Sequence, residues 1–219
     1  MFAKTYAKYY DLLNSDKPYK KECAFVYKWA EKPKSIFDIG AGTGNYWKYY
    51  PSDVDMFGVD NSPEMTDRAS ELICIVYGDI MRYKLHSQIH PCGYDCATAL
   101  FNVINYIPKH DWWAENINLK KGGYFIFDVW DKKKVDTSGF RMTIKSKSGI
   151  TRIINPLSYD GKRVKLNVTL ASADFEETEL HTMYIYNEAE IKRFCGRQFK
   201  IVDKKETKTW QTFYKLRRV

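Results

Sequence analysis

Three glycines alternate with small residues in the segment 38–45, whose sequence is DIGAGTGN. Glycine loses more backbone freedom on folding than any other residue, so this density is unfavourable inside a helix or strand. It instead allows a tight turn and a close approach of the backbone to a ligand. Because the segment follows the apolar run 35–39 and precedes a helix-compatible stretch, we predict a strand followed by a ligand-binding turn.

Short apolar runs recur through the first 130 residues, and several are separated by helix-compatible stretches. This alternation is typical of a mainly parallel α/β sheet. Before the first run, apolar and aromatic residues return every three or four positions, which predicts two amphipathic helices over 3–13 and 18–32 within a helical lid, residues 1–34. The expected strands are 35–39, 54–59, 72–77, 94–100 and 123–129.

The pattern changes after residue 131. Four strand-like runs succeed one another within 139–186, which predicts an antiparallel meander on the substrate side. A helix capped by Asn187 and two further strand-like runs, within 187–219, would complete the sheet. We therefore expect one α/β domain over 1–219: a doubly wound, seven-stranded, mainly parallel, Rossmann-like sheet with a cofactor-binding core at 35–131.

The spacing of the glycine-rich loop bears on its ligand. Dinucleotide folds prefer G-x-G-x-x-G, whereas this loop reads D-x-G-x-G-x-G, which disfavours NAD and FAD. Asp38 at its start suits the cationic amino acid end of S-adenosylmethionine and would repel a pyrophosphate. Taken alone, the loop admits either an adenosyl or a dinucleotide cofactor.

Two later carboxylates favour the adenosyl cofactor. Asp60 ends the second expected strand, where an acid can accept hydrogen bonds from both ribose hydroxyls. Asp79 follows the third strand, where it can accept from the adenine amine while Ile80 packs on the ring. The alternative is that Asp38, Asp60 and Asp79 only cap helices and turns.

With these motifs the sequence resembles the class I S-adenosylmethionine-dependent methyltransferases. DIGAGTGN, VDNSPEM and GDI match the first three motifs of that family, and the resemblance covers about residues 35–130. It implies an S-adenosylmethionine cofactor, with S-adenosylhomocysteine as product. Further cofactor contacts are expected from four residues of the first two motifs: Gly40, Gly42, Asn61 and Met65.

A weaker resemblance extends to the nucleotide-linked amino-sugar N,N-dimethyltransferases. It lies in Tyr10-Asp11-Leu12, in Lys17-Pro18-Tyr19, and in strands at 151–153 and 162–166 after the fifth strand. It implies that Tyr19 touches the methionine part of the cofactor, Tyr10 lines the substrate side and Phe101 sits beside the transferring methyl. Where that family carries a phosphate-binding arginine near the C-terminus, this chain has 208–211, KTWQ, so a nucleotide-linked sugar is only one candidate acceptor.

The general base is left open by the sequence. Methyl transfer needs alignment of an acceptor lone pair and, for a hydroxyl, removal of a proton. Tyr106 stands where the family often has a histidine. His181 in the last meander strand and Tyr10 are the other candidates, and the expected reaction is N- or O-methylation of a small, sugar- or phosphate-bearing metabolite without a metal.

Two alternative functions remain, an RNA methyltransferase and a cofactor-binding protein without turnover. The net charge of +8 is uneven, with +4 in residues 1–34 and +8 in residues 192–219, so a basic C-terminal face beside the cofactor would favour RNA. A DNA amino-methyltransferase is disfavoured because the fourth strand is followed by FNVINY. The spacing of His86, His90, Cys92 and Cys96 matches no common zinc pattern.

No run of about 20 apolar residues predicts a membrane span. Five irregularly spaced cysteines fit a reducing compartment, with buried and inert thiols. We expect a cytoplasmic monomer or homodimer with a small-molecule substrate.

Overall fold

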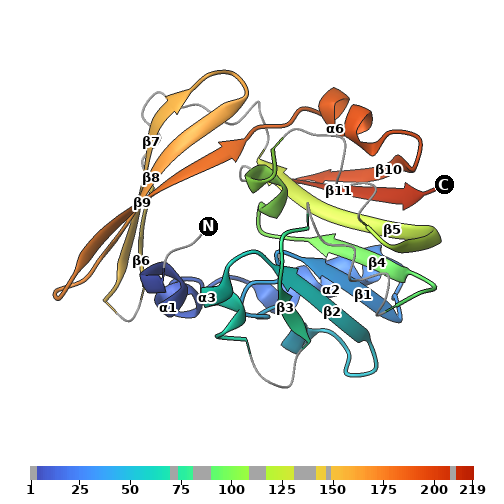
Figure 1. Cartoon of the computed structure of the whole chain (residues 1–219), viewed down its shortest axis with the longest axis horizontal. Helices are drawn as coiled ribbons and strands as arrows, with labels where there is room; N and C mark the ends of the chain where they lie inside the picture. The colour runs from blue at the N-terminus through green and yellow to red at the C-terminus, as the bar shows by residue number, and fades with distance from the viewer. Residues whose placement is uncertain are drawn as a thin grey trace.

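The strands of the chain form two separate sheets, as the computed structural model in Figure 1 shows. The structure describes residues 4–69, 74–80, 90–108, 117–130, 142–146, 149–207 and 211–219. The first sheet has seven strands in the order β10-β11-β5-β4-β1-β2-β3. Its strands are β1 (Ser35–Ile39), β2 (Asp55–Asp60), β3 (Ile75–Tyr77), β4 (Tyr94–Ala99), β5 (Leu119–Trp130), β10 (Phe199–Glu206) and β11 (Gln211–Arg218).

Strands β1 to β5 are mutually parallel, because each neighbouring pair in the order β5-β4-β1-β2-β3 has parallel register. β11 runs antiparallel to β5, and β10 pairs antiparallel with β11. The carboxyl ends of the five parallel strands therefore meet at one edge of the sheet. In open sheets of this kind, ligands bind in crevices at that edge.

The second sheet is an antiparallel meander in the order β6-β7-β8-β9, inserted between β5 and the last helix. Alternate residues of β8 are buried, which is the period-2 pattern of a sheet with one covered face. Its strands are β6 (Met142–Lys145), β7 (Thr151–Tyr159), β8 (Arg163–Ala171) and β9 (Glu176–Tyr184). The predicted fold class, a seven-stranded, mainly parallel sheet with an inserted meander, is confirmed.

Helices cover both faces of the main sheet and also support the meander. α2 packs on one face and α6 on the other, while α1 packs with the buried face of the antiparallel sheet (Figure 1). The helices are α1 (Lys4–Leu13), α2 (Tyr19–Trp29), α3 (Pro63–Thr66) and α6 (Glu188–Cys195), with short 3₁₀ turns η1 (Trp47–Tyr49) and η2 (Val103–Tyr106). Asn187 caps α6 as predicted, in a reciprocal pair of hydrogen bonds with Glu190.

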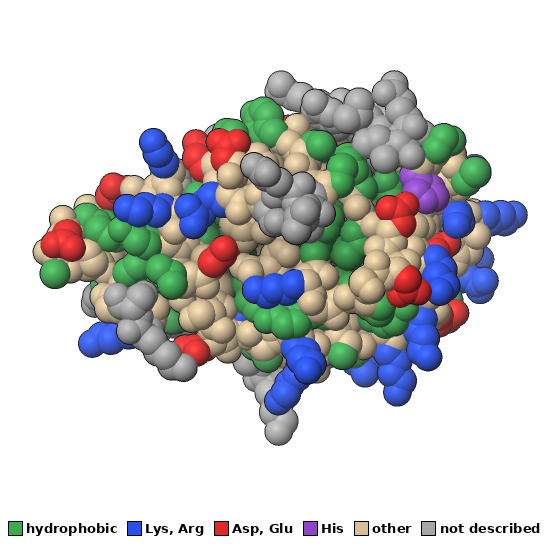
Figure 2. Space-filling view, turned by 90° about the horizontal axis from the view of Figure 1, so that it is seen from below, with side chains coloured by type: hydrophobic (Ala, Val, Ile, Leu, Met, Phe, Trp, Pro, Cys, Tyr) green, Lys and Arg blue, Asp and Glu red, His purple; other side chains and the backbone are tan. Residues whose placement is uncertain are grey.

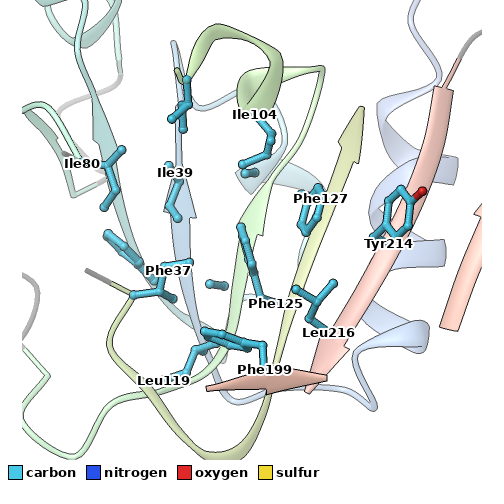
Figure 3. Packing of buried hydrophobic residues seen from close by; sticks show 14 of the residues in the cluster. Phe37, Ile39, Ile80, Ile104, Leu119, Phe125, Phe127, Phe199, Tyr214 and Leu216 are labelled. Atoms are coloured by element: carbon cyan, nitrogen blue, oxygen red, sulfur yellow. The ribbon is translucent and has the colours of Figure 1, made fainter. Parts of the chain in front are cut away.

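Aromatic and β-branched side chains form the core on the α6 side of the sheet. Phe37 of β1 and Phe125 and Phe127 of β5, the two strands that flank β4, are each at most 1% exposed and are shown in Figure 3. Truncating one such phenylalanine to alanine typically costs about 3–5 kcal/mol. This rigid layer holds the loops at the ends of the parallel strands.

Local features differ from the sequence expectation in three places. The stretch after the glycine-rich loop forms only the short turn η1, and α2 ends at Trp29, ahead of positive backbone φ angles at Glu31 and Lys32. Three cysteines are buried, but Cys74 and Cys92 are exposed, so the expectation of buried thiols is wrong for these two. No helix in the described ranges combines the length and apolarity that a bilayer crossing requires.

Candidate active site

The glycine-rich loop turns at the end of β1. Gly40 has φ +68°, and its amide donates to the carbonyl of Val59 in β2 at 2.8 Å. A Cβ at this position would lie 2.5 Å from a methyl of Val103, far inside van der Waals contact. The predicted need for glycine at position 40 thus has two causes, the left-handed backbone and the close packing of Val103.

The second glycine of the loop links it to Asp60. Gly42 donates its amide to Asp60 Oδ2 at 2.8 Å, and Ser62 donates its amide to Oδ1 at 2.9 Å. Burial raises the pKa of Asp60, while these backbone donors lower it. The Asn61 amide is a further backbone donor, and since a carboxylate has about four acceptor sites, Asp60 retains acceptor capacity for a ligand.

Asp38 faces into the protein. Its Oδ1 accepts from the Thr98 hydroxyl at 2.7 Å and its Oδ2 from the Trp47 indole at 2.8 Å, and the residue is 4% exposed. Burial raises its pKa to about 6, against the lowering effect of the two hydrogen bonds. In this placement Asp38 fixes the start of the loop through β4 and η1.

A cavity of about 320 Å³, here called the strand-end pocket, opens beside the loop at the ends of β1, β2 and β3. It brings together Gly40, Asp60, Asn61, Asp79 and Ile80, five of the residues predicted to bind the cofactor. The other described lining residues are Ile39, Val59, Gly78, Val103, Tyr106, Ile107 and Pro108.

Met65 of the second motif does not line this pocket. Its side chain is 1% exposed and belongs to the cluster formed with α1 and the meander. A buried thioether is good filler for an irregular gap between elements. The predicted cofactor contact of Met65 is therefore not supported by its position.

Tyr19 lies at the start of α2, packed edge-on against Tyr46 at 4.9 Å between ring centroids. Tyr19 is 6% exposed, and its buried hydroxyl has no partner in the described part of the chain. Burial raises the pKa of this phenol, with the nearby Asp11 as the next cause. An unpartnered buried hydroxyl is costly and marks a position where a ligand group can bind.

The ammonium group of Lys17 lies among the aromatic rings around Tyr19. Lys17 Nζ lies 4.8 Å from the ring centroid of Tyr19, 4.5 Å from that of Tyr46 and 4.8 Å from that of Phe101, and it pairs with Glu22. Aromatic faces and a carboxylate stabilise a cation. The surroundings of Tyr19 and Phe101 are therefore suited to positive charge.

The N-terminal helix is tied directly to the glycine-rich loop. Asp11 Oδ1 accepts from the Thr43 hydroxyl and the Asn45 amide, both at 2.6 Å. In the sequence, Asp11 is marked only as part of the motif Tyr10-Asp11-Leu12, which predicts no role for its carboxylate. Its hydrogen bonds depend on the fold, which places α1 against residues 43–45.

Two consecutive residues after β4 adopt left-handed backbone. Phe101 has φ +68° and Asn102 has φ +64°, and both amides donate to the carboxylate of Asp128, at 2.6 and 3.0 Å. Burial raises the pKa of Asp128 to about 7. Non-glycine residues held in this region are strained by about 1–3 kcal/mol, and such strain concentrates at functional sites.

A second cavity, of about 280 Å³, is the meander pocket. It lies between α1, η2 and the buried face of the antiparallel sheet, and it contains the predicted residues Tyr10, Phe101, Tyr106 and His181. Tyr106 borders this pocket and the strand-end pocket, so the two cavities adjoin at η2. The other described lining residues are Tyr6, Asn102, Trp130, Met142, Ile144, Arg152, Ile154, Leu166, Val168, Met183 and Gln211.

Two of the three candidate bases are directly connected. The Tyr106 hydroxyl lies 3.0 Å from His181 Nδ1, and His181 Nε2 lies 3.3 Å from Glu179 Oε2. With the ring proton on Nε2, the tyrosine donates to Nδ1 and the histidine donates to the glutamate. Burial raises the pKa of Tyr106, which keeps this phenol protonated. A role for Glu179 was not predicted, because an alternating strand pattern does not reveal which side chain contacts His181.

Tyr10, the third candidate, is placed differently. Its ring stands edge-on to Phe101 at 6.4 Å between centroids, and burial raises its pKa. Tyr10 lines the meander pocket, and its predicted role on the substrate side stays a prediction.

Basic residues of the C-terminal segment lie in more than one place. Lys200, Arg217 and Arg218 line one hollow together with Lys121, whereas others form ion pairs. Lys215 is 8% exposed and pairs with Glu31, while Lys192 and Lys204 both pair with Glu188. Arg217 pairs in register with Tyr124 near the start of β5, at the sheet edge opposite the two pockets. Figure 2 shows Lys and Arg side chains crowded at its right-hand end, away from the antiparallel sheet. No Lys or Arg is among the described lining residues of the strand-end pocket, so the basic surface that an RNA substrate would favour is not found at that pocket.

No metal-binding group of three or more His, Cys, Asp or Glu side chains occurs in the ranges that the structure describes. His86 lies outside those ranges, while His90, Cys92 and Cys96 lie within them.

No family model matches the chain, and no curated protein matches its sequence. Solved structures match it over nearly its whole length. An S-adenosylmethionine-dependent methyltransferase from Clostridium acetobutylicum is 20% identical with a TM-score of 0.79, covering 98% of both chains. An amino pentose methyltransferase from Micromonospora echinaspora, solved with S-adenosylmethionine bound, is 15% identical with a TM-score of 0.77, covering 100% of this chain and 98% of that one. A sugar N-methyltransferase from Streptoalloteichus is 16% identical with a TM-score of 0.72, covering 94% and 90%. At these identities the similarity establishes the fold.

Proposed function

We propose that this protein is an S-adenosylmethionine-dependent methyltransferase that acts on a small molecule. The main support is that the strand-end pocket and the meander pocket adjoin and share Tyr106. The first lies at the carboxyl ends of β1 to β3 and the second lies under the meander. An adenosyl cofactor belongs in the first and a methyl acceptor in the second. The fold shared with the three methyltransferases, two of which act on sugars or amino sugars by their names, supports this assignment.

The residues of the strand-end pocket fit the chemistry of the cofactor. Asp60 offers free lone pairs to the ribose hydroxyls, while Asp79 and Ile80 offer an acceptor and an apolar contact to adenine. The unpartnered Tyr19 hydroxyl and the ring-lined surroundings of Lys17 suit the charged methionine part. When bound, S-adenosylmethionine supplies a methyl group on a sulfonium that needs no further activation.

The protein's own residues then position the acceptor and receive its proton. Phe101, held in its strained conformation by Asp128, lines the meander pocket, as does Tyr106, which both pockets share. As the acceptor N–H or O–H loses its proton to the Tyr106 oxygen, the tyrosine passes its own proton to His181 Nδ1. Glu179 stabilises the resulting imidazolium. A phenol with a raised pKa does not act as a free phenolate, so the concerted relay is the route available to it.

Turnover of labelled S-adenosylmethionine against a panel of amines, sugars, nucleotide sugars and RNAs tests this function. We expect methyl transfer to a small molecule that carries an amine or hydroxyl. Transfer to RNA alone would contradict the proposal, as would cofactor binding without turnover of any acceptor.

A further inference from the structure

One charged side chain lies on the buried face of the antiparallel sheet and forms no ion pair with any residue that the structure describes. Arg152 of β7 is 8% exposed and borders the meander pocket. Its Nη1 donates to the Tyr6 hydroxyl at 3.0 Å and to Asn14 Oδ1 at 3.4 Å. Its Nε is buried and has no partner in the described part of the chain. These two hydrogen bonds of the guanidinium are thus with neutral side chains, one in α1 and one in the residue that follows it.

Among the described residues, the acid within ion-pair distance of this pocket's lining is Glu179, and it contacts His181 rather than Arg152. No Asp or Glu is among the pocket's described lining residues, which are mostly aromatic and aliphatic. Arginine is almost never fully buried unless paired, because desolvating a charge without a counter-charge is unfavourable. The guanidinium also presents a planar fork of donors that matches the oxygens of carboxylate and phosphate. A guanidinium that borders a ligand-sized cavity and has no ion pair among the described residues therefore points to an anion that arrives with the ligand.

We infer that the methyl acceptor carries an anionic oxygen group, a carboxylate or a phosphate, that binds Arg152 in the meander pocket. This inference rests on the proposed function. The volume of about 280 Å³ is near the lower limit for small-molecule sites, so the acceptor's body is compact. The rings of Tyr6, Tyr10 and Trp130 offer that body apolar and aromatic contacts.

A second polar contact is available at the same cavity. The side-chain oxygen of Asn102 is buried and has no partner among the described residues. It can accept from an N–H or O–H of the acceptor, while Arg152 holds the anion. Two fixed polar points in an apolar cavity determine a ligand's orientation.

Calorimetric titration with simple probes tests the inference. Benzoate and phenyl phosphate are the anionic probes, and benzyl alcohol is the neutral one. We expect the protein to bind at least one acid about tenfold or more tightly than the alcohol, and the better of the two identifies the anionic group. In Arg152→Met the acid affinity should fall at least tenfold while the alcohol affinity stays unchanged. Equal affinity for all three probes, or an unchanged acid affinity in Arg152→Met, would overturn the inference.

Two further variants separate charge recognition from folding. Arg163→Met removes an exposed arginine of the same sheet that pairs with Asp160, and it should keep the full preference for acids. Arg152→Lys keeps the charge without the planar fork and should retain part of the preference, whereas a complete loss would indicate a structural role. Titration of the same samples with S-adenosylhomocysteine reports on the proposed function separately, because acid preference without cofactor binding would contradict the methyltransferase proposal and leave the anion site standing.

Discussion

The two pockets differ in how they are built. The strand-end pocket is lined by residues at the ends of three strands, β1, β2 and β3, and by the segment around η2, and its charged groups among the described residues are carboxylates. The meander pocket gathers long side chains from α1, η2 and all four meander strands, and Arg152 is its charged group among the described residues. The first is a binding site set by chain topology, and the second depends on individual side chains. Variants of the two should therefore separate cofactor binding from acceptor binding.

The largest effect is expected at the residue that both pockets share. Tyr106→Phe keeps the ring and removes the hydroxyl that contacts His181, so kcat should fall by roughly 10²–10⁴ if proton removal accompanies transfer. Affinity for S-adenosylhomocysteine should stay within about twofold. The matched control is Tyr77→Phe, an exposed tyrosine of β3 that should retain full activity. An unchanged kcat in Tyr106→Phe would remove the relay from the mechanism.

Asp60→Ala addresses the strand-end pocket alone. It removes the carboxylate that holds Gly42 and is proposed to bind the ribose, so cofactor affinity should weaken by roughly 10- to 100-fold, the value of one to two charge-assisted hydrogen bonds. Benzoate binding in the meander pocket should be unchanged. Asp55→Ala alters an exposed acid at the other end of β2 and serves as the control. Equal cofactor affinity in both variants would contradict the placement of the ribose.

Gly40→Ala tests whether close packing against Val103, in addition to the left-handed backbone, requires glycine at this position of the strand-end pocket. The left-handed φ costs an alanine about 1–2 kcal/mol, and the contact with Val103 adds overpacking of similar size. The added Val103→Ala change should recover the packing part of the loss in unfolding free energy. Gly161→Ala, at φ +81° in a turn with open space, should show the backbone cost alone. A loss in Gly40→Ala no larger than in Gly161→Ala would exclude the packing cause.

The smallest effect is a pH dependence from the buried carboxylates. Burial raises the pKa of Asp128 to about 7 and that of Asp38 to about 6, above their usual value near 4 in the unfolded chain. Between these values the folded state binds more protons, so its stability should decrease as pH rises from about 4.5 to 7.5. Thermal unfolding across this window measures the trend, and Asp128→Asn should flatten it relative to the unaltered protein. A flat profile in both would contradict the raised pKa.

The strands, the fold class and the strand-end residues were predictable because each depends on local sequence. Parallel topology brings Gly40, Asp60 and Asp79 to one edge once the strands are correctly placed. The roles of Glu179 and Arg152 were not predictable, because each depends on contacts across more than one element. Met65 illustrates the same limit, since a motif position gave no warning that α1 and the meander would bury its side chain.

Calorimetric titration of the unaltered protein with S-adenosylhomocysteine tests the central claim most directly. We predict saturable binding with one site per chain, weakened in Asp60→Ala and retained in Asp55→Ala. A folded protein that shows no binding, or that binds NADH in preference, would contradict the assignment of the strand-end pocket to an adenosyl cofactor.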